Sequence, residues 1–212
     1  MSAEVSCPSC GAPAAFAWSG SVEAVCRYCR TVLLRTDVKV EQLGKRSDLP
    51  PDPSPVCLGT RGVYHGNPFT AVGRIVYEYE GGRWNEWSLV FADGTTGWLS
   101  DAQLQYAVTH QVTTMSAPAR ATTAVGSAFL INGKRFTVVS ITEARYLGVE
   151  GELPFRTWGR EVSVFADLRT AERHFATFDW SEAPGLVFAG DPVAFKDLKL
   201  SGLRTFDGWK EP

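Results

Sequence analysis

The sequence has few of the features that mark enzymes of familiar types. Its three histidines, His65, His110 and His174, lie in three separate segments, and none belongs to a His-Glu-x-x-His pair. The chain also lacks a Gly-x-Ser-x-Gly elbow, a phosphate-binding loop and a dinucleotide fingerprint. We therefore expect a protein that is not an enzyme.

Long apolar segments and an excess of charge of one sign are also missing. The first ten residues have neither the basic region nor the apolar stretch of a secretory signal, and no apolar run approaches the roughly 20 residues that span a bilayer. The net charge is −2, which gives no general attraction to nucleic acid phosphates or anionic membranes. We expect a cytoplasmic protein without a membrane span.

Cysteine is scarce, but four of the five cysteines form two Cys-x-x-Cys pairs. Cys7 and Cys10 are separated by 15 residues from Cys26 and Cys29, a spacing typical of a zinc ribbon. Four sulfurs fill a tetrahedral Zn²⁺ site, so we expect one structural zinc ion with no open position for a catalytic water. A redox pair would need a βαβ context that is missing here, whereas the spacing alone leaves an iron–sulfur cluster open.

The charge of the predicted ribbon bears on nucleic-acid binding, because zinc ribbons often contact nucleic acid. Residues 1–40 contain four basic and three acidic side chains. A balance of +1 is weak for a phosphate-binding face, and it favours a protein-docking or structural role.

The pattern of apolar residues and turns after the ribbon predicts β-structure. In residues 82–99, Asp93-Gly94 separates two apolar runs, which predicts a hairpin. A period of two places Trp87, Leu89 and Phe91 on one face of its first strand, the core face, and Trp84 and Glu86 on the other.

An internal duplication is also predicted. Residues 59–75 are similar in sequence to residues 126–141, and residues 175–188 can be aligned with the hairpin at 87–99. We expect an all-β fold composed of a zinc ribbon (1–37), a proline-rich linker (38–55) and two related small β-sheet or barrel-like units (56–110 and 124–207).

The glycine and tryptophan positions carry a resemblance to a known family. Together with a few neighbouring residues they are Gly59, Gly66-x-x-Phe69-x-x-x-Gly73, Trp84-Asn85-Glu86-Trp87, Trp98-Leu99, Gly126, Gly133-x-x-Phe136, Gly151-Glu152-Leu153-Pro154, Asp167 and Gly190. From Val56 to Leu203 the chain resembles the bacterial domain of unknown function 4178 family, whose members often carry a zinc ribbon in front. The resemblance implies a bacterial protein with a β-rich fold and brings no reaction with it. Similar genes tend to lie beside polyamine-synthase-like enzymes and small membrane proteins of stress-response clusters.

These observations favour a non-catalytic zinc-binding adaptor or binding module in a bacterial protein complex, with a protein as its partner. Two alternatives stay open: a sensor of a small cationic ligand such as a polyamine, and a nucleic-acid-binding ribbon protein. For the sensor, Trp84, Glu86 and Glu152 are candidate ligand-binding residues, since aromatic rings and carboxylates attract cations. The competing interpretation makes Glu86 an outward carboxylate on an edge strand.

Overall fold

The computed structural model describes residues 3–16, 18–36, 40–45, 49, 52–157 and 159–207. These residues form strands joined by turns, with two short 3-10 helices, and the all-β prediction is confirmed. The strands are β1 (Ala3–Ser6), β2 (Pro13–Phe16), β3 (Glu23–Val25), β4 (Thr31–Arg35), β5 (Val40–Lys45), β6 (Arg61–Tyr64), β7 (Asn67–Tyr79), β8 (Gly82–Phe91), β9 (Thr96–Ala102), β10 (Gln105–Gln111), β11 (Ala128–Ile131), β12 (Lys134–Leu153), β13 (Val162–Arg169), β14 (Phe175–Asp179) and β15 (Leu186–Val193). The helices are η1 (Arg120–Thr122) and η2 (Phe195–Leu198).

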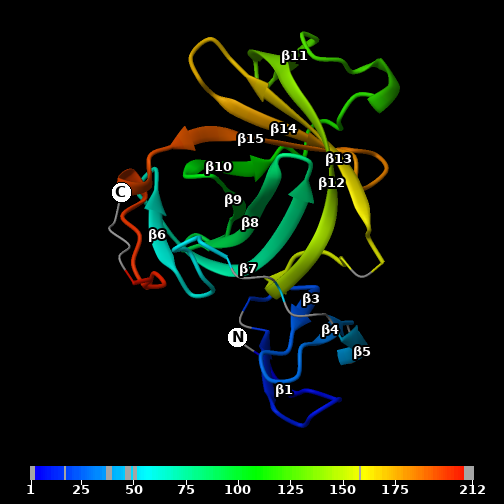
Figure 1. Ribbon diagram of the computed structural model, residues 1–212, viewed down its shortest axis with the longest axis vertical. Helices are drawn as coiled ribbons and strands as arrows, with labels where there is room; N and C mark the ends of the chain where they lie inside the picture. Colours follow the sequence, from blue (N-terminus) through cyan, green and yellow to red (C-terminus); the bar gives the residue numbers. More distant parts are fainter. Residues whose placement is uncertain are drawn as a thin grey trace.

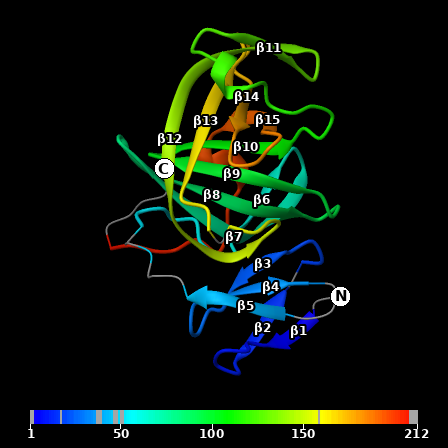
Figure 2. The ribbon, with the colours of Figure 1, turned by 90° about the vertical axis from the view of Figure 1, so that its right-hand side faces the viewer.

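The N-terminal ribbon consists of a β1–β2 hairpin and a three-stranded sheet in the order β5-β4-β3. It lies at one end of the molecule, next to β7 and β12 (Figure 1, Figure 2). The structure differs here from the expected linker, because β5 falls within residues 38–55 and pairs with β4. Other parts of that predicted linker, at 38–39, 46–48 and 50–51, lie outside the described residues.

The larger part of the chain forms a closed antiparallel barrel of eight strands. Neighbouring strands pair in the order β12-β13-β14-β15-β10-β9-β8-β7, and β7 pairs again with β12, so the ring has no free edge. The predicted hairpin at 82–99 is confirmed as β8 and β9, which lie inside this order. The two stretches predicted as β-units therefore share one sheet, with β7–β10 from the first and β12–β15 from the second.

The two halves of the barrel meet at two seams, and each seam contains a glycine at a close backbone approach. At the β7–β12 seam, a Cβ on Gly73 would lie 1.9 Å from the carbonyl oxygen of Glu152. At the β10–β15 seam, a Cβ on Gly190 would lie 1.9 Å from the carbonyl oxygen of Val108. No real Cβ contact is this short, so both seams need glycine at these positions.

The hydrogen bonds at the start of each half repeat with an offset of 67 residues. The Gly59 N–H donates to the Ala71 carbonyl (2.8 Å), and the Gly126 N–H donates to the Val138 carbonyl (2.9 Å). The turns β6–β7 and β11–β12 also match, since His65 and Asn132 both have φ of 49°. A bulge follows in each case, between residues 71 and 73 and between residues 138 and 140. The first part of the predicted duplication agrees with these pairings.

The second part of the predicted duplication needs a correction. By strand order, β12, β13, β14 and β15 are the counterparts of β7, β8, β9 and β10. The β14–β15 hairpin therefore corresponds to β9–β10, and laying residues 175–188 against residues 87–99 is out of register by one strand. Similar apolar patterns in neighbouring strands of one sheet caused the error, because alternation alone does not distinguish one strand from the next.

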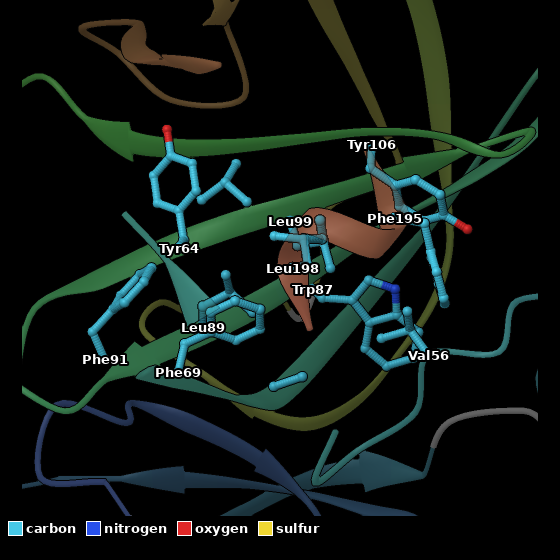
Figure 3. Packing of buried hydrophobic residues seen from close by; sticks show 12 residues of the cluster. Val56, Tyr64, Phe69, Trp87, Leu89, Phe91, Leu99, Tyr106, Phe195 and Leu198 are labelled. Carbon is cyan, nitrogen blue, oxygen red and sulfur yellow. The ribbon is translucent and has the colours of Figure 1, made fainter. Parts of the chain in front are cut away.

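Each half has its own apolar core on the outer face of the barrel sheet. In the first half, Trp87 and Leu89 are fully buried, as the predicted core face requires. Figure 3 shows that Phe195 and Leu198 of η2 pack over this face, beside Tyr106 and Leu99. In the second half, the fully buried residues Ile131, Leu168 and Phe178 belong to a separate cluster. The inner face of the ring carries a third apolar cluster, which includes Ile75, Tyr77 and Phe165, together with polar and carboxyl side chains.

Candidate metal centre and barrel cavity

Two structurally equivalent turns carry the four cysteines. In the β1–β2 turn, the Gly11 N–H donates to the Cys7 carbonyl (2.8 Å), and in the β3–β4 turn the Arg30 N–H donates to the Cys26 carbonyl (2.9 Å). Gly11 and Arg30 both have left-handed backbone conformations, with φ of 74° and 59°. Each turn thereby directs its two sulfurs to the same side, as in a zinc knuckle.

The four sulfurs converge on a single point. The Sγ atoms of Cys7, Cys10, Cys26 and Cys29 all lie within 4.8 Å of one another. The Cys7–Cys29 sulfurs are 3.7 Å apart and the Cys10–Cys26 sulfurs are 3.9 Å apart. A tetrahedron with metal–sulfur bonds of about 2.3 Å has edges of about 3.8 Å, so this arrangement fits one tetrahedral metal ion.

The surroundings favour the metal-binding thiolate form at Cys29, whereas at Cys10 a backbone hydrogen bond is outweighed by the neighbouring sulfurs and burial, which raise the pKa of Cys10 to about 12. The Cys29 sulfur lies 3.1 Å from the Thr31 hydroxyl. Hydrogen bonds from the side chain and backbone of Thr31 lower the pKa of Cys29 to about 6. A thiolate at neutral pH is the ligand form of cysteine. Cys7 and Cys26 are buried and belong to a small apolar cluster with Phe16 and Leu33.

Two buried glutamates join the ribbon to the barrel in opposite directions. Glu152, on barrel strand β12, accepts hydrogen bonds from the backbone N–H of Trp18 (3.2 Å) and from the Ser21 hydroxyl. Glu23, on ribbon strand β3, accepts hydrogen bonds from the backbone N–H of Thr157 (2.9 Å) and from its hydroxyl. Strand β3 also pairs with the end of β12, so the ribbon continues the barrel sheet.

The barrel contains a cavity of about 1040 Å³ that is open to solvent. Every one of the eight barrel strands contributes residues to its lining, so the cavity occupies the interior and opens at the rim. Carboxyl groups of Glu86 and Asp167 line it, and Asp179 lines a smaller adjoining space that Glu86 shares. Trp84, Phe165 and Phe175 add aromatic walls. Arg169 also lines the cavity, with its guanidinium 4.3 Å from the centre of the Phe175 ring, so basic side chains share this space with the carboxyl groups and aromatic rings.

The interior carboxyl groups bind protons more strongly than ordinary carboxyl groups. Burial raises the pKa of Glu86 to about 8, and the nearby charges of Asp167 and Asp179 raise it further. Burial also raises the pKa of Asp167 and that of Asp179. Glu86 accepts hydrogen bonds from the Trp84 indole (3.0 Å) and the Ser100 hydroxyl (2.9 Å). These bonds fix the direction in which its carboxyl group faces the cavity.

The structure brings together two of the three residues predicted to bind a ligand. Trp84 and Glu86 are hydrogen-bonded to each other on the inner face of β8, whereas Glu152 lies at the junction with the ribbon. The interpretation of Glu86 as an outward carboxylate on an edge strand is wrong, because β8 lies between β7 and β9 and Glu86 lines the cavity.

Sequence reasoning missed Asp167 and Asp179 as interior groups. They come from the second half of the chain and face Glu86 only because the ring closes. The alternation of side chains along β13 and β14 could have assigned the two aspartates to one face of the sheet. It could not have shown that this is the face that carries Glu86.

A second polar cluster lies at the rim of the cavity. Asp191 accepts a hydrogen bond from the Tyr64 hydroxyl (2.8 Å) and lies 2.5 Å from His174 Nδ1 and 3.2 Å from His65 Nε2. Lys134 Nζ lies 2.5 Å from the other ring nitrogen of His174. Hydrogen bonds to its carboxylate offset partial burial and lower the pKa of Asp191. The cluster ties turns of both halves to strand β15.

These features define an all-β protein in which a closed antiparallel barrel carries a four-cysteine module suited to one metal ion. The family described as Domain of unknown function (DUF4178) matches residues 57–194, and the chain belongs to this family. The resemblance found in the sequence is thereby confirmed for the barrel. No curated protein and no solved structure shows a significant match to the chain. Among the described residues, no helix is long and apolar enough to cross a membrane.

Proposed function

We propose that this protein is a non-catalytic binding module. In this proposal a zinc ribbon stabilises one end of the molecule, and the barrel binds a small organic cation. The observation that carries the proposal is the cavity, in which Glu86 and Asp167 share an open space with aromatic side chains, among them Trp84 and Phe165. The carboxyl groups supply charge attraction once an approaching cation favours loss of their protons, and aromatic faces supply cation–π attraction; together they favour an ammonium group over a neutral ligand.

The size of the cavity supports a ligand larger than a metal ion. Binding sites for small organic molecules occupy roughly 300–1,000 Å³, and the barrel cavity is at the upper end of this range. Carboxyl groups on both sides of the interior, Glu86 from β8 and Asp167 from β13, suit a ligand with more than one cationic group. A linear polyamine has this chemistry.

The proposed role of zinc is structural. Four sulfurs at the observed spacing fill the coordination sphere of a tetrahedral ion, so no position is left for a reacting water. The donor set of four sulfurs suits Zn²⁺, which prefers this arrangement in small ribbons. The protein partner that the sequence favours is a separate part of the proposal and is taken up below.

The nucleic-acid alternative has less support. The balance of +1 in residues 1–40 provides little attraction to phosphates, and the ribbon directs its β3 edge to the barrel rather than to solvent.

Calorimetric titration of the full-length, metal-loaded protein with spermidine tests the cation proposal. We expect saturable heat for the native protein and an affinity reduced about tenfold or more for Glu86→Gln, since one close carboxylate contributes on the order of 1.5–3 kcal/mol to a charged hydrogen bond. Glu143→Gln is the matched control, because Glu143 is on the same sheet but exposed to solvent. No saturable heat, or equal affinity for Glu86→Gln, would refute cation binding in the cavity.

A further inference from the structure

The two edge strands of the repeat, β6 and β11, occupy equivalent positions but have different surroundings. Each pairs with the long strand that follows it, β7 or β12. At β6, the chain's own C-terminal segment covers the outer edge: the Arg61 N–H donates to the Ser201 carbonyl (3.0 Å), and the Ser201 N–H donates to the Arg61 carbonyl (2.8 Å). At β11, the position equivalent to Arg61 is Ala128, and within the described part of the chain β11 pairs with β12 alone.

The backbone of β11 presents hydrogen-bonding groups on its outer edge. The Val138 N–H donates to the Ser127 carbonyl (2.9 Å), so Ser127 and the alternate residues Phe129 and Ile131 face β12. Ala128 and Leu130 therefore direct their N–H and C=O groups outward, as Arg61 does in the first half. A strand with such a free edge is a template for an additional strand.

A side-chain difference between the repeats accounts for the covered edge at β6 and for the edge of β11 that the described residues leave uncovered. At Gly62, a Cβ would meet Leu200 and the Leu198 carbonyl, so glycine leaves the space that the C-terminal segment fills. The equivalent residue in β11 is Phe129, whose ring packs against Phe178 (5.2 Å between centroids). In the second half, the Phe129 side chain fills the core position, and the described residues leave the outer backbone edge of β11 uncovered.

The surface around β11 is apolar and basic. Leu130 is 70% exposed and Val125 is 62% exposed. From Ala102 to Thr142 the chain contains no Asp or Glu, whereas Arg120, Lys134 and Arg135 lie in this range. Lys134 interacts with Glu172, and Arg135 is the basic residue opposite Leu130 in the sheet. The protein as a whole carries a charge of −2, so this positive region is a local feature.

We propose that the free edge of β11 is a docking site for an extended acidic segment of a partner protein, which adds an antiparallel strand beside β11. The covered edge of β6 shows how such a segment pairs, and the basic surroundings select for acidic residues between apolar ones. This inference deepens the adaptor side of the proposed function.

The test uses two labelled peptides and the full-length protein. The probe is Leu-Glu-Leu-Ser-Gly-Leu-Glu, which is segment 198–204 with glutamate in place of Lys199 and Arg204. The unchanged segment is the control peptide. Fluorescence anisotropy should show saturable binding of the acidic peptide, at least fivefold weaker binding of the control, and at least fivefold weaker binding of the acidic peptide to Arg135→Glu. Arg83→Glu, on an exposed arginine far from β11 in the sheet order, should bind the acidic peptide normally.

Amide hydrogen exchange then locates the contact. We expect the acidic peptide to slow exchange at Ala128 and Leu130, the outward-facing amides, and to leave Phe129 and Ile131 unchanged. No binding, equal binding to Arg135→Glu, or protection at other strands would overturn the proposal. Concentration-dependent protection of Ala128 and Leu130 without peptide, together with dimer formation, would assign the edge to a second copy and equally overturn it. Spermidine binding does not involve β11, so failure of this test and failure of the cavity proposal are distinguishable.

Discussion

At the scale of single residues, Glu86 shows how a common side chain gains an uncommon property from its position. On an exposed strand its carboxyl group would lose its proton near pH 4.5, but inside the barrel burial and the neighbouring aspartates raise its pKa to about 8. The native protein therefore holds a proton on Glu86 at neutral pH. Folding becomes less favourable as pH rises from about 4.5 towards 8, because the unfolded chain then loses a proton that the folded chain retains.

We predict that binding of an organic cation releases a proton from Glu86. An ammonium group next to Glu86 favours the carboxylate and lowers its pKa, so at pH 7 complex formation should release up to about one proton, and affinity should rise between pH 6 and pH 8. Calorimetric titration with spermidine in buffers of different ionisation enthalpy measures this proton directly. The release should disappear in Glu86→Gln and persist in Glu143→Gln. A buffer-independent heat for the native protein would contradict the prediction.

At the scale of secondary-structure elements, the barrel depends on two long strands and two glycine-bearing seams. Strands β7 and β12 each bend at a bulge, so that their first parts pair within their own half and their last parts pair with each other. The seams close because Gly73 and Gly190 allow neighbouring backbones to approach.

We predict that Gly190→Ala destabilises the protein by at least about 2–3 kcal/mol, because the new methyl group would force β15 away from the Val108 carbonyl. Urea unfolding followed by tryptophan fluorescence measures the change. Gly148→Ala is the control: its Cβ would contact only the flexible side chain of Leu49, which can move. Equal stabilities of the two variants would show that the β10–β15 seam tolerates a side chain.

At the scale of the whole molecule, the ribbon and the barrel depend on different sources of stability. The barrel has three apolar clusters, whereas the ribbon has a small cluster of apolar residues and the four cysteines. A module of this size obtains much of its folding free energy from metal binding. The side-chain carboxylates of Glu23 and Glu152 connect the two parts by accepting hydrogen bonds from backbone N–H groups of Thr157 and Trp18.

We predict that metal removal unfolds the ribbon and leaves the barrel folded. After treatment with a strong chelator, amide exchange should become fast in residues 3–36 and remain slow in β8, β9 and β14, and elemental analysis of the untreated protein should give one zinc per chain. Loss of the β3–β12 hydrogen bonds should also speed exchange at the end of β12. Zinc-free protein with the ribbon amides still protected would rule out metal as the source of ribbon stability.

The sequence by itself determined the features that depend on local pattern. The spacing of the cysteines predicted the sulfur cluster, and Asp93-Gly94 between alternating apolar residues predicted the β8–β9 hairpin with Trp87 on its core face. The repeat of glycine and phenylalanine positions predicted the equivalence of the β6–β7 and β11–β12 turns. Each of these signals lies within a few residues or a fixed spacing, so no long-range contact is needed to read it.

Only the tertiary structure decided which residues meet across the barrel. Closure of the ring places Asp167 and Asp179 opposite Glu86, and it moves Glu152 from the predicted pocket to the junction with the ribbon. Alternation along a strand assigns each side chain to one of two faces, but which face becomes the interior depends on strand order and on the two seams. The pairing of strands that are far apart in the chain therefore creates the cavity.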